Sequence, residues 1–264
     1  MHKIALLGRD IAYTKSPAVH CAIAQALCED IAFDVFDTPY DKLSGAVATL
    51  LRDYDGFFVT KPYKTEIKRF ISGADFSVNL VRCADKTAYS TDGVGFMRAL
   101  DRNFPDWKNN VNAVLVLGTG GAAHAVVGAL TSVGKKVYVL GRSVVNSAKL
   151  ITQHKNAELY TGQSAEMAVN CTPLGLNGED ALFAFCVPPA FMYAYDAVYT
   201  DTITPFLRRN RNSGAMIADG TDMLLYQAIE GDRILLKKQF DVQKVYSSAA
   251  KILIESGDIS GGVY

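Results

Sequence analysis

Three short segments concentrate polar side chains in otherwise apolar surroundings. They are Thr14-Lys15-Ser16-Pro17, Thr60-Lys61-Pro62-Tyr63-Lys64 and Ser90-Thr91-Asp92-Gly93. A lysine next to an aspartate can donate a proton to a developing alkoxide, and hydroxyl groups can bind a carboxylate without carrying charge themselves. The segments are therefore candidates for orienting a substrate and supplying a proton donor. Singly, each also fits a plainer interpretation, with Lys64 an exposed lysine and Asp92, Thr14 or Ser16 a helix cap.

A glycine-rich turn lies farther along the chain, between an apolar run and a helical pattern. The run from Val111 to Leu117 leads into Gly118-Thr119-Gly120-Gly121-Ala122-Ala123, and helical periodicity continues to about Val133. Gly118 permits a tight turn, Gly120 lets the backbone approach a pyrophosphate, and Ala123 allows close packing of helix on strand. The helix N-terminus adds amide donors and a positive dipole. The pattern predicts a dinucleotide site, the alternative being only a tight strand-to-helix connection.

The end of the next predicted strand indicates which dinucleotide binds. Lys136 to Leu140 ends in Gly141-Arg142-Ser143, where a site for NAD usually carries an acidic residue. Arg142 offers a planar fork for a 2′-phosphate and Ser143 a second donor, although a solvated loop arginine is the alternative for Arg142. NADP is therefore the expected cofactor. Met167 to Cys171, followed by Thr172, is typical of a strand whose carboxyl end opens toward the nicotinamide.

These segments resemble motifs of the shikimate dehydrogenase family, in the family's order and spacing. Ser16-Pro17-Ala18-Val19-His20 is similar to the S-x-S-P-x-x-H opening, with Thr14 in place of the first serine. Val59 to Lys64 resembles N-V-T-x-P-x-K, and Ser90 to Gly93 resembles N-T-D-G. Asp196-Ala197-Val198-Tyr199 with Thr204-Pro205 is similar to D-x-x-Y...T-P, and Gly220, Met223-Leu224 and Gln227 to G-x-x-M-L-x-x-Q. The resemblance runs from residue 8 to about residue 230.

The resemblance implies reversible reduction of 3-dehydroshikimate to shikimate by NADPH, in aromatic amino-acid and chorismate biosynthesis. It also implies two domains with the active site in the cleft. Lys64 and Asp92 would form the catalytic pair, and Thr14 and Ser16 would hold the substrate carboxylate. The acid or ring hydroxyls would contact Thr60, Tyr199 and Gln227. The residues assigned to the cofactor are the glycine turn from Gly118 to Ala123, Arg142, Ser143, Cys171, Thr172 and Gly220.

The chain departs from the family pattern beside the expected substrate. Phe58 stands where the family has the asparagine of N-V-T, and Ser90 replaces that of N-T-D-G. The family's A-x-N-T motif aligns best with Ala84-Asp85-Lys86-Thr87, so Lys86 takes the place of the asparagine that contacts the ring, with Asp85 as the neighbouring alternative. Lys86 then either forms a salt bridge with Asp92 or points to solvent. We expect these changes to remove polar contacts and to lower activity without abolishing it.

The order of the predicted elements defines the fold class. Apolar runs bounded by turn residues alternate with helical stretches, which predicts an α/β protein with largely parallel sheets. We expect an N-terminal α/β substrate domain over residues 1–92, with helices from 222–264 packing back on it, and a Rossmann-like NADP-binding domain over 93–221. The polar segment Leu100 to Asn112 contains Pro105 and precedes the strongest strand, as a domain junction would.

Composition limits the other functions of the chain. Lys+Arg and Asp+Glu both number 27, so no excess charge attracts nucleic acid or an anionic membrane, and a small-molecule partner is expected. The apolar run near the N-terminus is too short for a signal or membrane segment, which predicts a cytoplasmic protein. A monomer or homodimer is expected. Five scattered cysteines predict reduced thiols. His20 and His124 are expected to pack rather than bind metal.

Two other functions remain open on the sequence alone. One is a related dehydrogenase that acts on quinate, aminoshikimate or another ring acid. The other is a catalytically silent NADP-binding protein, which Phe58 and Lys86 favour. The retained Lys64, Asp92 and Gln227 argue against a silent protein, because binding NADP alone needs none of them.

Overall fold

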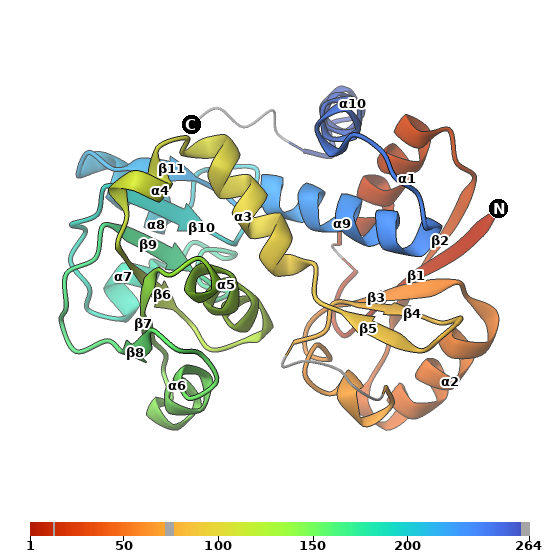
Figure 1. The fold of residues 1–264 in the computed structure, drawn as a ribbon, viewed down its shortest axis with the longest axis horizontal. Coiled ribbons are helices and arrows are strands. Elements are labelled where there is room, and N and C mark those ends of the chain that lie inside the picture. The colour runs from red at the N-terminus through yellow and green to blue at the C-terminus, as the bar shows by residue number, and fades with distance from the viewer. Residues whose placement is uncertain (13, 72–76, 260–264) are drawn as a thin grey trace. The chain divides into compact units, whose positions relative to one another are not determined.

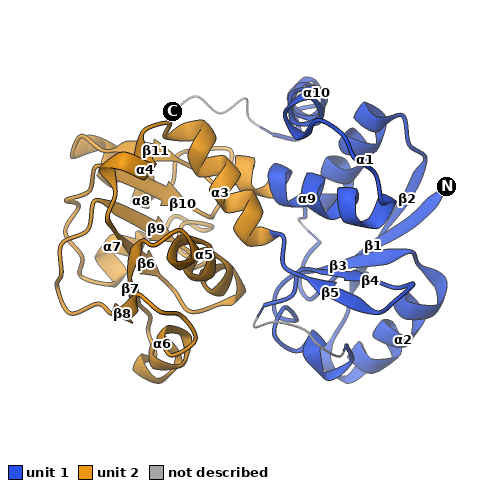
Figure 2. Ribbon diagram, in the orientation of Figure 1, with its two compact units in different colours: residues 1–91, 225–261 blue, residues 92–224, 262–264 orange. Residues whose placement is uncertain are grey.

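The computed structural model describes residues 1–12, 14–71 and 77–259 (Figure 1). The chain divides into two compact units (Figure 2). The first unit contains residues 1–91 and 225–261, and the second contains residues 92–224 and 262–264. The helices expected to rejoin the N-terminal half therefore begin within α9, and residues 260–264 lie outside the described residues. None of the described helices is both long and apolar enough to cross a membrane.

The first unit is built from strands β1 to β5 and four longer helices. Its strands are β1 (His2–Gly8), β2 (Ile31–Asp37), β3 (Gly56–Val59), β4 (Leu80–Arg82) and β5 (Thr87–Tyr89). Its helices are α1 (Ser16–Leu27), α2 (Leu43–Asp53), α10 (Val242–Glu255) and most of α9 (Thr221–Leu236), with short 3-10 helices at Tyr40–Lys42 and Ile67–Arg69. The sheet order is β2-β1-β3-β4-β5, parallel over the first three strands and antiparallel over the last two.

Alternation along the strands gives this sheet two buried faces. Ala5 and Leu7 belong to a core cluster with Leu50 of α2, whereas Ile4 and Leu6 belong to a cluster with Leu235 of α9. Successive side chains of a strand point to opposite faces, so α2 covers one face and α9 the other (Figure 1). The helix α1 packs on α10. Because β1 and β3 are parallel, the loops that follow them leave the sheet on the same side.

The second unit is a parallel six-stranded sheet flanked by helices. Its strands are β6 (Ala113–Leu117), β7 (Lys136–Leu140), β8 (Ala157–Leu159), β9 (Met167–Asn170), β10 (Tyr193–Asp196) and β11 (Met216–Ala218). Its helices are α3 (Asp92–Asn103), α4 (Trp107–Asn110), α5 (Gly121–Ser132), α6 (Val144–Ile151), α7 (Ala181–Ala184) and α8 (Pro205–Asn212). The order β11-β10-β9-β6-β7-β8 is that of a doubly wound dinucleotide-binding sheet, which confirms the predicted fold class.

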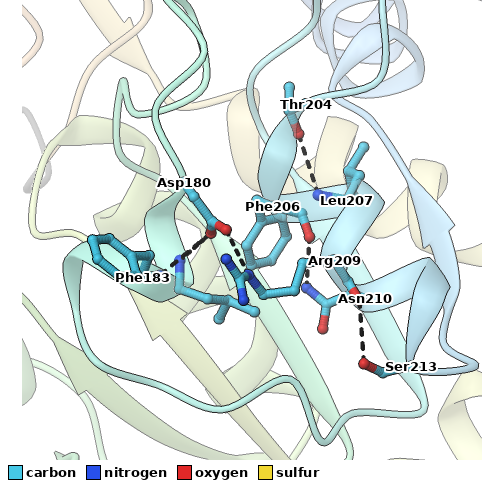
Figure 3. A network of polar contacts seen from close by, with 9 residues as sticks. Asp180, Phe183, Thr204, Phe206, Leu207, Arg209, Asn210 and Ser213 are labelled. Atoms are coloured by element: carbon cyan, nitrogen blue, oxygen red, sulfur yellow. Dashed lines mark hydrogen bonds and ion pairs between the residues drawn. The ribbon is translucent and has the colours of Figure 1, made fainter.

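The helices that follow β9 and β10 are tied to each other. Asp180 caps α7 by accepting from the amides of Leu182 and Phe183, and its other oxygen accepts from Nε of Arg209 on α8 at 2.6 Å (Figure 3). The α8 cap is Thr204, which accepts from the amide of Leu207 (Figure 3). Because each cap ends a loop that begins at a strand, this network fixes the far ends of the loops 171–180 and 197–204.

Two expectations about local structure are wrong. The segment 100–112 is no domain junction, because α3 and α4 both belong to the second unit and Trp107 is fully buried there, donating to Asp101. Its polar residues are the exposed positions of short helices around that anchor. Neither Thr14 nor Ser16 caps α1, since Lys15 holds the cap position without a side-chain hydrogen bond.

Candidate active site

The glycine turn of the second unit connects β6 to α5. Gly118 has φ of +111°, which favours glycine, and a side chain there would press on the carbonyl of Cys171 at 3.0 Å. Gly120 has ordinary extended backbone, and a side chain built on it would meet nothing within 4 Å. Gly120 is therefore needed for the open space that it leaves and not for its backbone conformation. Ala123 is completely buried, as close packing of helix on strand requires.

The N-terminus of α5 carries no side-chain cap, whereas the side chains of Ser143, Asp180, Thr204 and Asp241 cap α6, α7, α8 and α10. The first amides of α5, at Gly121, Ala122 and Ala123, precede the first hydrogen-bonded turn, in which His124 donates to the carbonyl of Gly120. Amide donors beside an open glycine form a cradle that fits a pyrophosphate. The residues present thus fit a dinucleotide.

The loop after β7 adjoins this cradle. A side chain at Gly141 would lie 2.6 Å from the methyl group of Thr119, so the two loops pack directly together. Arg142 is exposed, and Ser143 accepts from the amide of Asn146 at the start of α6, which leaves its hydroxyl proton able to donate. The predicted pair for a 2′-phosphate therefore lies one loop away from the glycine turn.

The strands β6 and β9 are neighbours at the point where the order of the sheet reverses. The amide of Cys171 donates to the carbonyl of Leu117 at 2.8 Å, which places the loop after β9 beside Gly118. Burial, together with the carboxylates of Asp196 and Asp92, raises the pKa of the Cys171 thiol far above its usual value. Cys171 is therefore a neutral thiol at physiological pH and not a nucleophile.

A buried hydrogen-bond network holds this loop to the next one. Asp196 is completely buried; its Oδ1 accepts from Nδ2 of Asn170 at 2.9 Å, and its Oδ2 accepts from the hydroxyl of Thr204 at 2.6 Å. Asn170 in turn accepts from the amide and hydroxyl of Thr172. Burial raises the pKa of Asp196 to about 7, although the bonds from Thr204, Val198 and Asn170 oppose the rise. The network sets the loops that carry Thr172 and Tyr199.

Gly220 has a packing reason to be glycine. A side chain there would lie 2.4 Å from the carbonyl oxygen of Ala197, so the backbone after β11 meets the backbone after β10 directly. Asp92 and Gly93 open α3, and a side chain at Gly93 would contact the carbonyl of Ala125 on α5 at 3.2 Å. Asp92 thus lies within the second unit beside the helix that starts at the glycine turn.

In the first unit, Thr14 and Ser16 meet at the start of α1. The Thr14 hydroxyl donates to Oγ of Ser16 at 3.1 Å and accepts from the Ser16 amide at 3.3 Å. Both residues follow β1, whose neighbour β3 leads into Thr60 and Lys64. Two half-buried hydroxyl groups at a helix N-terminus suit the carboxylate that the family resemblance implies.

Thr60, Lys64 and Asn79 lie at the carboxyl end of β3. The amide of Thr60 donates to the carbonyl of Leu7, and the amide of Val59 donates to that of Asn79. The carbonyl of Lys64 accepts from the amide of Val78 at 2.9 Å. The chain between Thr60 and Lys64 is thereby held against the residues that precede β4.

Asn79, which the sequence analysis did not select, organises the polar centre of the first unit. Its Nδ2 lies 2.7 Å from Oγ1 of Thr91 and 3.0 Å from Oε1 of Gln227, and its Oδ1 accepts from the Thr91 amide at 2.6 Å. The hydroxyl of Thr91 donates to the Gln227 carbonyl at 2.9 Å. We call Asn79, Thr91 and Gln227 the amide–hydroxyl cluster. Asp92 follows it directly in the chain.

The position of Lys86 argues against its assignment to the ring and favours the alternative that it points to solvent. Lys86 is exposed, has φ of 53°, and ends the turn between β4 and β5, while Asp85 in the same turn pairs with Arg82. In the hairpin Leu80 pairs with Tyr89, so Asn79 is at its base and Lys86 at its tip. A salt bridge of the Arg82 guanidinium lowers the pKa of Asp85 and stabilises the turn.

The hairpin was mistaken for a shortened loop, which displaced the alignment. Ser77-Val78-Asn79-Leu80 fits the A-x-N-T motif once serine replaces alanine and leucine replaces threonine. In this register the β4–β5 hairpin lies between Asn79 and Asp92. The signal that could have identified Asn79 was its distance from Asp92, not the letters around it.

Phe58 does not remove a polar group from the site. It is buried in the α9 face of the first sheet, in a cluster with Ile4, Leu6 and Leu80. The buried ring of His20 lies 4.2 Å from it, centroid to centroid. His20 does pack, as expected, but it is also hydrogen-bonded to a buried carboxylate, Asp232. Among the described residues, no group of three or more His, Cys, Asp or Glu side chains is arranged to hold a metal ion.

The predicted cofactor residues all belong to the second unit, whereas the catalytic pair and the predicted substrate residues are divided between the two units. Lys64 belongs to the first unit and Asp92 to the second, so their pairing remains a prediction. Tyr199, half-buried in the loop after β10, also belongs to the second unit, apart from Thr60 and Gln227. The first unit supplies hydroxyl and amide groups, and the second supplies the cradle, Arg142 and Asp92.

Comparisons with known proteins identify the family of this chain and the kind of domain in its first unit. Residues 6–82 match the family model described as the shikimate dehydrogenase substrate binding domain. A shikimate dehydrogenase (NADP(+)) of Caldicellulosiruptor bescii is 30% identical, covering 89% of each chain, and one of Nitrosopumilus maritimus is 29% identical, covering 87% of this chain and 91% of that one. The structure of Thermus thermophilus shikimate 5-dehydrogenase with NADP(H) and shikimate superposes with a TM-score of 0.81 at 27% identity, covering 96% of this chain and 100% of the other. Sequence over nearly the whole length and the order of both sheets lead to one conclusion: this chain belongs to the shikimate dehydrogenase family.

Proposed function

We propose that the protein is an NADP-dependent oxidoreductase that reversibly reduces 3-dehydroshikimate to shikimate, in aromatic amino-acid and chorismate biosynthesis. The observation that carries the proposal is the amide–hydroxyl cluster of Asn79, Thr91 and Gln227, which leads directly into Asp92. Amide and hydroxyl groups of this kind recognise ring hydroxyls by donating and accepting at once. The named activities of the relatives support the same substrate.

NADP is held by the second unit in this proposal. The cradle of Gly118 to Ala123 takes the pyrophosphate, and Arg142 with Ser143 takes the 2′-phosphate. Cys171 and Thr172 would border the nicotinamide end, with Gly220 of the loop after β11 as a further cofactor contact. When bound, the nicotinamide supplies or accepts the hydride.

The chain's own residues bind the acid and handle the proton. Thr14 and Ser16 hold the carboxylate, while Thr60, Asn79, Gln227 and Tyr199 contact the carboxylate or the ring hydroxyls. Lys64 donates a proton to the carbonyl oxygen of the substrate during its reduction. Asp92 orients Lys64 and stabilises its protonated form. We place this chemistry in a cytoplasmic monomer or homodimer whose partners are small molecules.

The proposal of a silent NADP-binding protein loses its support. It depended on Phe58 and Lys86, and these residues are in the core and at a hairpin tip. A related ring acid is still distinguished from shikimate only by assay. Reduction of NADP at 340 nm with shikimate, quinate and aminoshikimate tests the function: shikimate should be oxidised with the highest kcat/KM, and no oxidation of any of the three would overturn the proposal.

A further inference from the structure

A second layer of side chains lies behind three of the proposed substrate contacts. On α1, His20 is four residues after Ser16, and on α9, Gly231 is four residues after Gln227, so each pair shares a helix face. On β3, Phe58 is two residues before Thr60, which continues the ladder, so this pair shares a face of the sheet. Each element that presents a substrate contact thus presents a second residue one step along the same face.

These second residues contact one another, and His20 also contacts Asp232, which follows Gly231 on α9. Nδ1 of His20 lies 2.9 Å from both carboxylate oxygens of Asp232, and both side chains are almost fully buried, 1% and 3% exposed. The His20 ring stacks on Phe33 with a centroid distance of 4.6 Å and lies against Phe58. A carboxylate buried with a single imidazole donor is costly to separate from it, so the contact fixes α1 against α9.

Phe58 and Gly231 fit each other by size. A side chain at Gly231 would lie 2.4 Å from Cε1 of Phe58, so the ring fills the space that glycine leaves on α9. The phenylalanine that replaces the family's asparagine therefore sets how closely α9 approaches β3. Through this contact β3 and α9 are joined, as α1 and α9 are joined through His20 and Asp232.

We propose that His20, Asp232 and Phe58 form a positioning layer that sets the spacing of Ser16, Gln227 and Thr60, and so the affinity of the site for its ring acid. The inference rests on the proposed function, because it assigns the layer to the binding of that acid. The proposed role of the layer is confined to the three anchors and does not include Lys64, the proposed proton donor, or the glycine turn of the second unit. Its loss should therefore raise KM for the acid without changing kcat or KM for NADP.

The test compares variants that remove the contact with one that keeps it. Asp232→Asn retains an acceptor oxygen for Nδ1 of His20. The double variant His20→Leu/Asp232→Leu removes the contact and the buried charge together, which avoids leaving one partner unpaired. Val47→Ala, on α2 at the opposite face of the sheet, is the matched control for loss of core packing. Thermal unfolding of each variant measures its folding separately from its kinetics.

Loss of one positioned hydrogen bond typically changes binding by about tenfold, so KM for shikimate should rise about tenfold or more in the double variant. Asp232→Asn and Val47→Ala should keep KM within about threefold of the wild-type value, even where they lower the melting temperature. A double variant that folds and keeps the wild-type KM, or the same affinity for shikimate in calorimetry, would overturn the positioning role.

Failure of the proposed function has a different signature. In that case the wild-type protein itself neither binds nor oxidises shikimate, quinate or aminoshikimate, and the inference fails with it. If the double variant lowers kcat and raises KM for NADP to the same extent as KM for shikimate, the layer only maintains the fold, and the positioning role is again refuted.

Discussion

Nδ2 of Asn79 lies 2.7 Å from the hydroxyl oxygen of Thr91, the residue that immediately precedes Asp92. The amide proposed to contact the ring and the start of the helix that carries the proposed acid–base partner are thus linked by one hydrogen bond and one peptide bond. Thr91 ends the first unit and Asp92 begins the second. The linkage ties recognition of the ring hydroxyls to the place where the two units join in sequence.

Replacing Asn79 should lower kcat/KM for shikimate far more than replacing Lys86. Asn79→Ala removes one neutral hydrogen-bonding group from the site, worth about 1–3 kcal/mol, so kcat/KM for shikimate should fall roughly tenfold to a hundredfold. Lys86→Ala, at the exposed hairpin tip, should leave kcat/KM within about twofold of wild type. Steady-state kinetics with saturating NADP measure both. If Lys86→Ala lowered kcat/KM more than Asn79→Ala did, Lys86 and not Asn79 would be the residue that contacts the ring.

The contrast between these residues shows how far the sequence predicts the site. The structure confirms the predicted strand, glycine turn and helix around Gly118 and the strand before Arg142, because these elements follow one another over a short stretch and local pattern determines local structure there. Asn79 was missed because serine and leucine flank it and the hairpin behind it looked like a shortened loop. The register of a hairpin is set by strand pairing, which the residue types next to Asn79 do not determine.

The contacts of Phe58 and His20 could not be predicted from the sequence, for another reason. Phe57, Phe58 and Val59 are all buried, so the run has no alternation that would tell which side chain faces the site. The bond from His20 to Asp232 joins residues 212 positions apart in sequence. Such a contact depends on how α9 returns to the first unit, and helical periodicity alone predicts a helix there without its partner.

The catalytic pair can be tested against a neighbouring lysine. Lys64→Ala should lower kcat by about 10²–10⁴-fold, the usual contribution of general acid–base catalysis, because no other group of this segment is assigned to the proton. Lys61→Ala, at an exposed position of the same segment, should retain nearly full kcat. Affinity for NADP, measured by calorimetry, should be unchanged in both because the cradle belongs to the second unit. Asp92→Asn should behave as Lys64→Ala, and nearly full kcat at neutral pH in either would rule out the pair.

Cofactor preference should depend on Arg142. Arg142→Asp removes a charge-assisted hydrogen bond to the 2′-phosphate and should weaken NADP binding by about 1–3 kcal/mol, with NAD binding little changed. Lys155→Asp provides the control, since it makes the same change of charge at an exposed position before β8, where the parallel strands begin, whereas Arg142 follows the end of β7. Calorimetric titration of both variants with both cofactors distinguishes a local contact from a general charge effect. Equal affinity of the wild-type protein for NAD and NADP would contradict the assignment.

Two glycines on helices should respond in opposite directions to alanine. Gly231→Ala places a methyl group 2.4 Å from the ring of Phe58 in the core and should lower the free energy of unfolding by about 1–3 kcal/mol. Gly45→Ala on α2, where a side chain would meet nothing within 4 Å, should raise it by about 0.5–1 kcal/mol. Urea unfolding measures both. If overpacking is the cause, Phe58→Leu should partly restore the stability of Gly231→Ala, and full additivity of the two changes would exclude contact between them.

The buried Asp196 should make stability fall as pH rises from about 4 to about 7. Its pKa is raised by burial from the ordinary 3.8 to about 7, so the folded state holds a proton that the unfolded chain releases. The stabilisation from this group is complete below about pH 4 and is lost as pH rises to about 7, at up to about 1.4 kcal/mol per pH unit. Asp196→Asn keeps an acceptor oxygen and cannot ionise, so its free energy of unfolding should vary less than that of the wild type between pH 5 and pH 7, whereas Asp106→Asn at an exposed position should follow the wild type. Urea unfolding across this range provides the comparison. Parallel curves for wild type and Asp196→Asn would mean that the carboxyl group is ionised throughout, and that the bonds from Asn170, Thr204 and Val198 outweigh its burial.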